Sequence, residues 1–265
     1  QIEQAIESYQ RAIEIKPERA VGFIMLSQIY SAQGNPDQAM ENLKKVIKSD
    51  PECAEAYLNM GTILKEKGDL QAAIKNYQRA IEIDPNIAGF YHNMGSAFRD
   101  LGNLDSAIKN FKKALIIDPN CAETYNNMGN ALNEKGDHEA AINNYQQAIK
   151  IKPHYAEIYC NMGNAQQNSG DLVGAINTYR KSIKIKPDHI EAHSNMGAAL
   201  NAAGSYQEAI NSYKQATKID HSCYTSYYNM GLIQEANNNP NEAIENFQRV
   251  LELDPDNVSA RHILS

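Results

Sequence analysis

The amino-acid sequence predicts an all-α fold in which antiparallel helix pairs stack into an α-solenoid. The prediction rests on a 34-residue repeat, two amphipathic helix patterns in each repeat, and the absence of any strand-like alternation of polar and apolar residues. Three series of residues share this period. They are the prolines Pro17, Pro51, Pro85, Pro119, Pro153 and Pro187, the glycines Gly61, Gly95, Gly129, Gly163, Gly197 and Gly231, and the glycines Gly34, Gly68, Gly102, Gly136, Gly170 and Gly204.

The segment 54–87 shows how one repeat divides into two helices. Its apolar residues recur at steps of three and four, which places each set on one face of a helix. The first set is Tyr57, Met60 and Leu64, and the second is Ala73, Tyr77, Ala80 and Ile81. The dipeptide Gly68-Asp69 separates the two sets, so we expect one helix on each side of it.

Residues that favour helix ends stand at both junctions of the repeat. The glycine between the two helices suits a left-handed residue that ends the first helix, and a residue typical of helix N-caps follows it. These seven residues are Asn35, Asp69, Asn103, Asp137, Asp171, Ser205 and Asn239. At the other junction, four aspartates precede a proline, and we expect them to cap the first helix of the next repeat. They are Asp50, Asp84, Asp118 and Asp254.

The period divides the chain into one repeat array. Seven full repeats run from Ala20 to Asn257, with partial repeats at 1–19 and 258–265. Both ends fall inside a unit, and no polar capping unit is visible at either end. We therefore expect a fragment of a longer protein, whose further domains or targeting signal the sequence does not display.

Composition excludes several classes of function. The formal charge is −7, which argues against a nucleic-acid binder that relies on a basic face. The longest apolar runs are far shorter than a membrane span. The four cysteines predict reduced thiols and a cytoplasmic or nuclear protein. We expect no catalytic residues, no cofactor and no metal, since His189 and His193 lack a third ligand and no nucleophile–base group is apparent.

The repeat resembles the tetratricopeptide repeat family. In the segment 54–87 the matching residues are Tyr57, Met60, Gly61, Leu64, Ala73, Tyr77, Ala80 and Pro85. Ser27, in the place of the glycine, and His221, in the place of the proline, depart from the pattern. The resemblance implies a right-handed superhelix whose first helices line a concave groove, and a function in binding protein or peptide partners.

One polar column falls on the expected lining of that groove. It consists of Asn59, Asn93, Asn127, Asn161, Asn195 and Asn229, with Met25 at this place in the first full repeat. A side-chain amide offers one acceptor and two donors, so a regular row of amides can pair with the backbone of an extended peptide. Alternatively, the asparagines were copied during duplication, or they only join neighbouring helices. We predict the peptide-binding row.

Further amide and acidic residues are predicted to flank this row. They are Asn126, Asn130, Asn133, Asn164, Asn168, Glu66, Asp100 and Glu134. Such a groove favours a neutral-to-basic peptide. Glutamates that begin the first helices, such as Glu123, Glu157 and Glu191, have a competing explanation, because acidic side chains also stabilise a helix N-terminus.

The residues of the predicted groove bear on three other binding modes. Chaperone-binding members of the family hold a C-terminal carboxylate with cationic groove residues, and the corresponding positions here carry none, so we do not expect that mode. The asparagine column is similar to that of the O-linked N-acetylglucosamine transferase family, which implies a substrate-recruiting arm of a glycosyltransferase as an alternative. A third alternative is a scaffold that assembles subunits through its convex face; self-association is left open.

Overall fold

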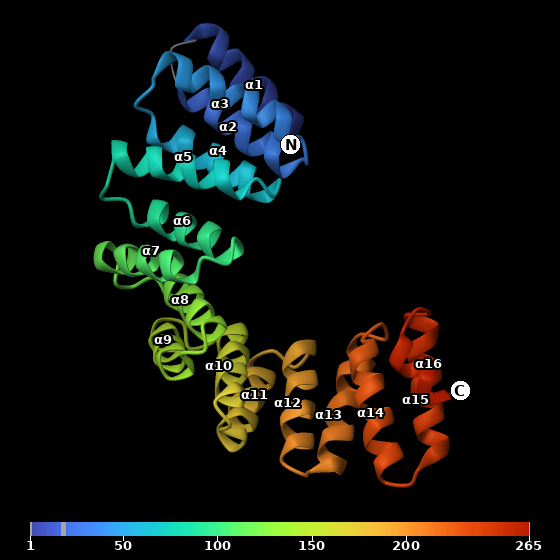
Figure 1. The fold of residues 1–265 in the computed structure, drawn as a ribbon. Coiled ribbons are helices and arrows are strands. Elements are labelled where there is room, and N and C mark those ends of the chain that lie inside the picture. Colours follow the sequence, from blue (N-terminus) through green and yellow to red (C-terminus); the bar gives the residue numbers. More distant parts are fainter. Residues whose placement is uncertain (1, 17–19, 265) are drawn as a thin grey trace. The chain divides into compact units, whose positions relative to one another are not determined.

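A computed structural model describes residues 2–16 and 20–264, and within them the chain forms sixteen α-helices and no strand (Figure 1). Pro17, Gln1 and Ser265 lie outside the described residues. The first helices of the repeats are α2 (Ala20–Ala32), α4 (Ala54–Glu66), α6 (Ala88–Asp100), α8 (Ala122–Glu134), α10 (Ala156–Asn168), α12 (Ile190–Ala202), α14 (Tyr224–Ala236) and α16 (Val258–Leu264). The second helices are α1 (Ile2–Ile15), α3 (Pro36–Ser49), α5 (Leu70–Ile83), α7 (Leu104–Ile117), α9 (His138–Ile151), α11 (Leu172–Ile185), α13 (Tyr206–Ile219) and α15 (Pro240–Leu253).

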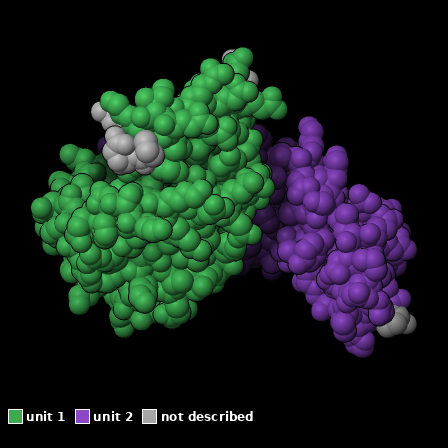
Figure 2. Space-filling view, turned by 90° about the horizontal axis from the view of Figure 1, so that it is seen from above, with its two compact units in different colours: residues 1–131 green, residues 132–265 purple. Residues whose placement is uncertain are grey.

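The chain forms two compact units, Gln1–Ala131 and Leu132–Ser265 (Figure 2). In the first unit, α4 packs on α5 and α6 on α7. In the second, α10 packs on α11, α12 on α13 and α14 on α15. The predicted all-α class with consecutive helix pairs is confirmed. None of these described helices is long and apolar enough to cross a membrane.

The core of each repeat centres on a ring from the second helix. In six repeats a ring at this position is almost completely inaccessible to solvent, and in the first full repeat a leucine takes its place: Leu43, Tyr77, Phe111, Tyr145, Tyr179, Tyr213 and Phe247. Five of the rings lie against a glycine of the preceding first helix: Tyr77, Phe111, Tyr179, Tyr213 and Phe247. A Cβ atom at Gly61 would be 2.6 Å from Tyr77, and one at Gly95 would be 2.9 Å from Phe111. The glycines that follow Asn-Met therefore allow an aromatic ring to approach the helix backbone.

The first helices are buried over a wider face than the sequence pattern predicts. In α4 the buried residues are Ala56, Met60, Gly61 and Ile63, while Tyr57 and Leu64 are only partly buried. The reason is that α4 contacts α5, α3, α2 and α6. A helix with several neighbours buries residues on more than one side, so its apolar residues do not form a single stripe.

The turn inside each repeat follows the prediction. All six predicted turn glycines, from Gly34 to Gly204, have positive φ, as does Asn238 in the seventh place, with φ of 57°. Four of the seven predicted N-cap residues accept a hydrogen bond from the backbone three residues on: Asp69, Asn103, Asp137 and Asp171. Asn35, Ser205 and Asn239 occupy the N-cap position without a side-chain bond.

The prediction for the aspartates that precede proline is wrong. Asp50, Asp84, Asp118 and Asp254 are the C-caps of the second helices, not the N-caps of the next first helices. In the first three, Oδ1 accepts the backbone N–H two residues later, at 3.0 to 3.1 Å. The aspartate therefore stabilises the turn after a helix, as Asx turns do. Proline follows it inside this turn, and the next helix begins four residues after the aspartate.

Candidate functional site

The six asparagines of the predicted row are all half-buried and occupy the same position of successive first helices. Asn59, Asn93 and Asn127 belong to the first unit, and Asn161, Asn195 and Asn229 to the second. Their surroundings differ, because the side chains at neighbouring positions change from repeat to repeat.

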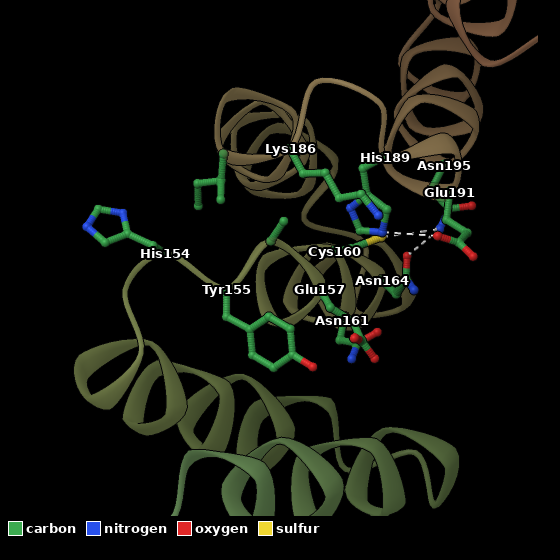
Figure 3. Close-up of a pocket in the computed structure, with 12 residues that line it drawn as sticks. His154, Tyr155, Glu157, Cys160, Asn161, Asn164, Lys186, His189, Glu191 and Asn195 are labelled. Atoms are coloured by element: carbon green, nitrogen blue, oxygen red, sulfur yellow. Dashed lines mark hydrogen bonds and ion pairs between the residues drawn. The ribbon is translucent and has the colours of Figure 1, made fainter. Parts of the chain in front are cut away.

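In the second unit the row borders a pocket of about 700 Å³ between the N-terminal halves of α10 and α12. Asn161 and Asn164 enter it from α10 and Asn195 from α12, as Figure 3 shows. The Nδ2 atom of Asn195 donates to Oδ1 of Asn164 at 2.9 Å. This bond joins two consecutive first helices. The same Nδ2 atom also donates to the Cys160 sulfur, which leaves Oδ1 of Asn195 for other partners.

The core holds Asn164 in place. The hydroxyl of Tyr179, whose ring is fully buried, donates to Oδ1 of Asn164 at 2.7 Å. Cys160 is the buried floor of the pocket, and its sulfur lies 4.0 Å from the Asn195 Nδ2. Burial raises the pKa of the Cys160 thiol to about 12, with Glu191 adding to the effect. The thiol is therefore protonated at neutral pH and is not a nucleophile.

Glutamates and a buried histidine complete the pocket wall. Glu157 and Glu191 line it, and the Glu191 carboxylate lies 3.0 Å from Nε2 of His189. The other nitrogen of His189 lies 2.8 Å from the Ser182 hydroxyl, which donates to a backbone carbonyl. Both nitrogens thus have protein partners. Within residues 2–16 and 20–264, no cluster of three or more His, Cys, Asp or Glu residues is placed to hold a metal.

In the first unit, Asn127 contacts a histidine of the preceding first helix. Its Nδ2 atom lies 3.4 Å from Nε2 of His92, and Nδ1 of His92 lies 2.8 Å from the Thr124 hydroxyl. The His92 ring packs edge-on against Phe111, with 5.8 Å between ring centroids. Burial lowers the pKa of His92, so the ring is neutral at pH 7.

Asn59 and Asn229 also turn their amide nitrogens toward the protein. The Nδ2 atom of Asn59 is buried without a hydrogen-bond partner in the described part of the chain. Burial raises the pKa of Tyr213 to about 12, and a hydrogen bond with Asn229 acts in the opposite direction. Such a bond lowers a phenol pKa only when the amide donates to the phenol oxygen.

The predicted flanking residues differ in their burial and in their hydrogen bonds. Asn133 accepts hydrogen bonds from His138 at 2.8 Å and Asn168 at 3.2 Å, and Asn126 is buried. Glu66, Asp100 and Glu134 are exposed. Lys65 pairs with Asp100 at 3.0 Å, so this position contributes less negative charge than the sequence pattern suggests. The remaining members are Asn130, which is half-buried, and Asn164, described above.

Sequence reasoning did not identify the residues that hold the row. His92 and Cys160 contact the asparagine 35 positions later, and both belong to the column immediately before the row. This column varies between repeats: Leu58, His92, Asn126, Cys160, Ser194 and Tyr228. A comparison at offset 35 instead of 34 would have paired each member except Tyr228 with the asparagine of the following repeat.

Sequence profiles agree with the repeat architecture. Profiles of the TPR repeat match residues 61–98, 95–136, 129–170, 168–202 and 197–238, and those of the tetratricopeptide repeat match residues 1–60 and 224–257. The chain belongs to the tetratricopeptide repeat family. No curated protein sequence matches this tetratricopeptide repeat chain significantly.

Several solved structures resemble this one. A crystal structure of MamA is 31% identical, covers 61% of this chain and 95% of its own, and superposes with a TM-score of 0.57. PilF of Pseudomonas aeruginosa is 19% identical, covers 81% and 97%, and has a TM-score of 0.67. YrrB, described as a TPR protein with an unusual peptide-binding site, is 21% identical, covers 71% and 96%, and has a TM-score of 0.58.

Proposed function

We propose that this tetratricopeptide repeat chain is a protein-interaction module that binds an extended peptide segment through its row of asparagines. The observation that carries the proposal is the row itself: six half-buried amides at one position of successive first helices. Two of them, Asn161 and Asn195, border the 700 Å³ pocket of the second unit. Polar groups at this depth favour a ligand that supplies hydrogen bonds.

The hydrogen bonds inside the protein are compatible with this role. An amide has two donors and one acceptor, and the Nδ2 group of Asn195 donates to Asn164 Oδ1 and to Cys160 Sγ. A backbone N–H group of an extended chain matches the unused Oδ1 acceptor of Asn195. Such pairing depends on backbone groups instead of side chains, so one groove can bind segments of different sequence.

Charge favours a neutral or basic ligand. Glu157 and Glu191 line the pocket in the second unit, together with Lys186. A Lys or Arg side chain of a bound segment would reach carboxylates at the pocket rim while its backbone follows the amides. YrrB, whose fold is similar, supports peptide binding as the general function.

The test uses a display library of random twelve-residue peptides. Peptides are selected on the wild-type chain, and their affinities are compared with those for the combined variant Asn127→Ala, Asn161→Ala and Asn195→Ala. A matched control replaces three exposed asparagines of second helices: Asn143→Ala, Asn177→Ala and Asn211→Ala. We expect affinity to fall at least tenfold in the first variant only, from the loss of several hydrogen bonds of ~1 kcal/mol each. Equal affinity for both variants, with helicity intact by circular dichroism, rejects the proposal.

The same row supports a second candidate, the substrate-recruiting arm of a glycosyltransferase of the O-linked N-acetylglucosamine transferase type. Here the bound segment would be a substrate of an attached catalytic domain. The sequence of the gene beyond the codon for Ser265 distinguishes the two: a glycosyltransferase domain in the same reading frame supports the arm. If only variants on the outer faces of second helices disturb assembly, the chain is instead a structural scaffold.

A further inference from the structure

We propose that His92 is a positioning residue that fixes the orientation of the Asn127 side-chain amide, so that its Oδ1 atom faces the ligand as an acceptor. The inference rests on the proposed function for the identity of the ligand, and on a chain of hydrogen bonds in the first unit for the orientation itself. It predicts that a bound peptide places an N–H group opposite Asn127.

The chain of hydrogen bonds runs through five side chains of α6, α8 and the turn before α8. Cys121 Sγ lies 3.8 Å from a carboxylate oxygen of Glu123, and the Thr124 hydroxyl lies 3.0 Å from this sulfur. The same hydroxyl is 2.8 Å from Nδ1 of His92. Nε2 of His92 is 3.4 Å from Nδ2 of Asn127. Each side chain thus has a partner on both sides, except the two at the ends.

Glu123 determines the direction of this chain. A carboxylate only accepts hydrogen bonds, so the Cys121 S–H donates to it and the sulfur is left to accept the Thr124 O–H. The Thr124 oxygen then accepts from Nδ1–H of His92. A neutral imidazole that carries its proton on Nδ1 has a lone pair on Nε2, and this lone pair faces Asn127.

The neutral form of His92 is the one that the site favours at pH 7. Burial is the main cause of its lowered pKa, Lys65 and Arg99 lower the pKa further, and Glu123 acts against them. The Nε2 lone pair therefore requires a donor from Asn127, which places Nδ2 inward. The amide then offers its Oδ1 and its second Nδ2 hydrogen in a fixed order.

The neighbouring repeat supplies a matched control. The residue 35 positions before Asn93 is Leu58, which has no hydrogen-bonding side-chain atom. The variant His92→Leu therefore gives Asn127 the neighbour that Asn93 already has, and Leu is accommodated at this position in the fold. Thr124→Val breaks the chain of hydrogen bonds one link earlier at nearly constant volume, whereas Thr124→Ser retains the hydroxyl.

The first experiment needs no ligand. Long-range ¹⁵N–¹H correlation spectra of the full chain at pH 7 report which nitrogen of His92 carries the proton. We expect Nδ1–H in the wild type and in Thr124→Ser, and a loss of that preference in Thr124→Val. The Asn127 side-chain amide signals should shift in Thr124→Val and His92→Leu, while those of Asn93 stay in place. An Nε2–H ring in the wild type overturns the inference.

The second experiment uses the peptides selected from the random library, each synthesised with one backbone amide at a time replaced by an ester, which removes an N–H. We expect one ester position to weaken binding to the wild type about fivefold, the value of one hydrogen bond. In Asn127→Ala the same ester should not change the affinity, and in His92→Leu it should weaken binding by less than about twofold. If the ester weakens binding to His92→Leu as much as to the wild type, the positioning role is wrong. If instead no asparagine variant changes the affinity of the peptides, the proposed function is rejected, and the NMR spectra of the first experiment alone test the role of His92.

Discussion

A Cβ atom on Gly163 would lie 2.5 Å from Cε1 of Tyr179, so the Tyr179 ring rests directly on the backbone of α10. This close approach brings the Tyr179 hydroxyl to Asn164, which in turn accepts a hydrogen bond from Asn195 of the row. A core contact that requires glycine thereby positions a groove side chain. The repeat with Ser27 in the place of this glycine has Leu43 in the place of the ring, and both are buried.

We expect Gly163→Ala to lower the free energy of unfolding by ~1–3 kcal/mol, because the added methyl overlaps a ring that cannot move freely in a packed core. The combination Gly163→Ala with Tyr179→Leu should cost less than the sum of the two single variants, since Leu43 accommodates a side chain at Ser27. Urea unfolding followed by circular dichroism measures the three values. Additive losses would show that the contact is not the cause.

A second prediction concerns the helix caps. Oδ1 of Asp171 accepts the backbone N–H of Gly174 at 2.9 Å, whereas the side chain of Asn239 makes no capping bond. Asp171→Ala should therefore reduce stability by ~1 kcal/mol, and Asn239→Ala by only a few tenths. Thermal melts of both variants compare them directly. An equal decrease would contradict the assignment of the caps.

The turn glycines allow a test of backbone conformation alone. Gly170 has φ of 86°, and a Cβ atom there would meet nothing within 4 Å. Gly170→Ala should thus cost ~1 kcal/mol from the left-handed conformation, without any steric clash. Gly170→Asn should cost less, because Asn238 adopts φ of 57° in the equivalent turn. Chemical denaturation midpoints rank the variants, and a larger loss for Asn than for Ala would be inconsistent.

Stability should fall as the pH rises through the alkaline range. The Cys160 thiol has an ordinary pKa of 9.0, and burial raises it to about 12 in the folded chain. Between these values the unfolded chain binds fewer protons than the folded one, so stability decreases with pH by up to ~1.4 kcal/mol per pH unit for this group. Cys160→Ala should reduce that slope. Urea midpoints at pH 8 and pH 10.5 measure it, with Cys53→Ala as the control at a half-buried position.

The helix pairs were predictable because the signals that produce them are local and repeated. The spacing of Ala73, Tyr77 and Ala80 specifies one buried face, and the glycine and cap residues specify where the chain turns. The role of Asp84 was not predictable in the same way. An aspartate before proline suits an N-cap and an Asx turn alike, and the end of the preceding helix determines which one forms.

The repeat pattern alone thus specified the all-α class, the two helices of each repeat and the asparagine row, since period, amphipathicity and turn chemistry act within a few residues of one another. Folding decided what each asparagine contacts. His92 meets Asn127, and Asn164 meets Asn195, across 35 and 31 positions of sequence, because consecutive first helices lie side by side. Hydrogen-bond direction and burial depend on those neighbours, and neighbours exist only after the helices have packed.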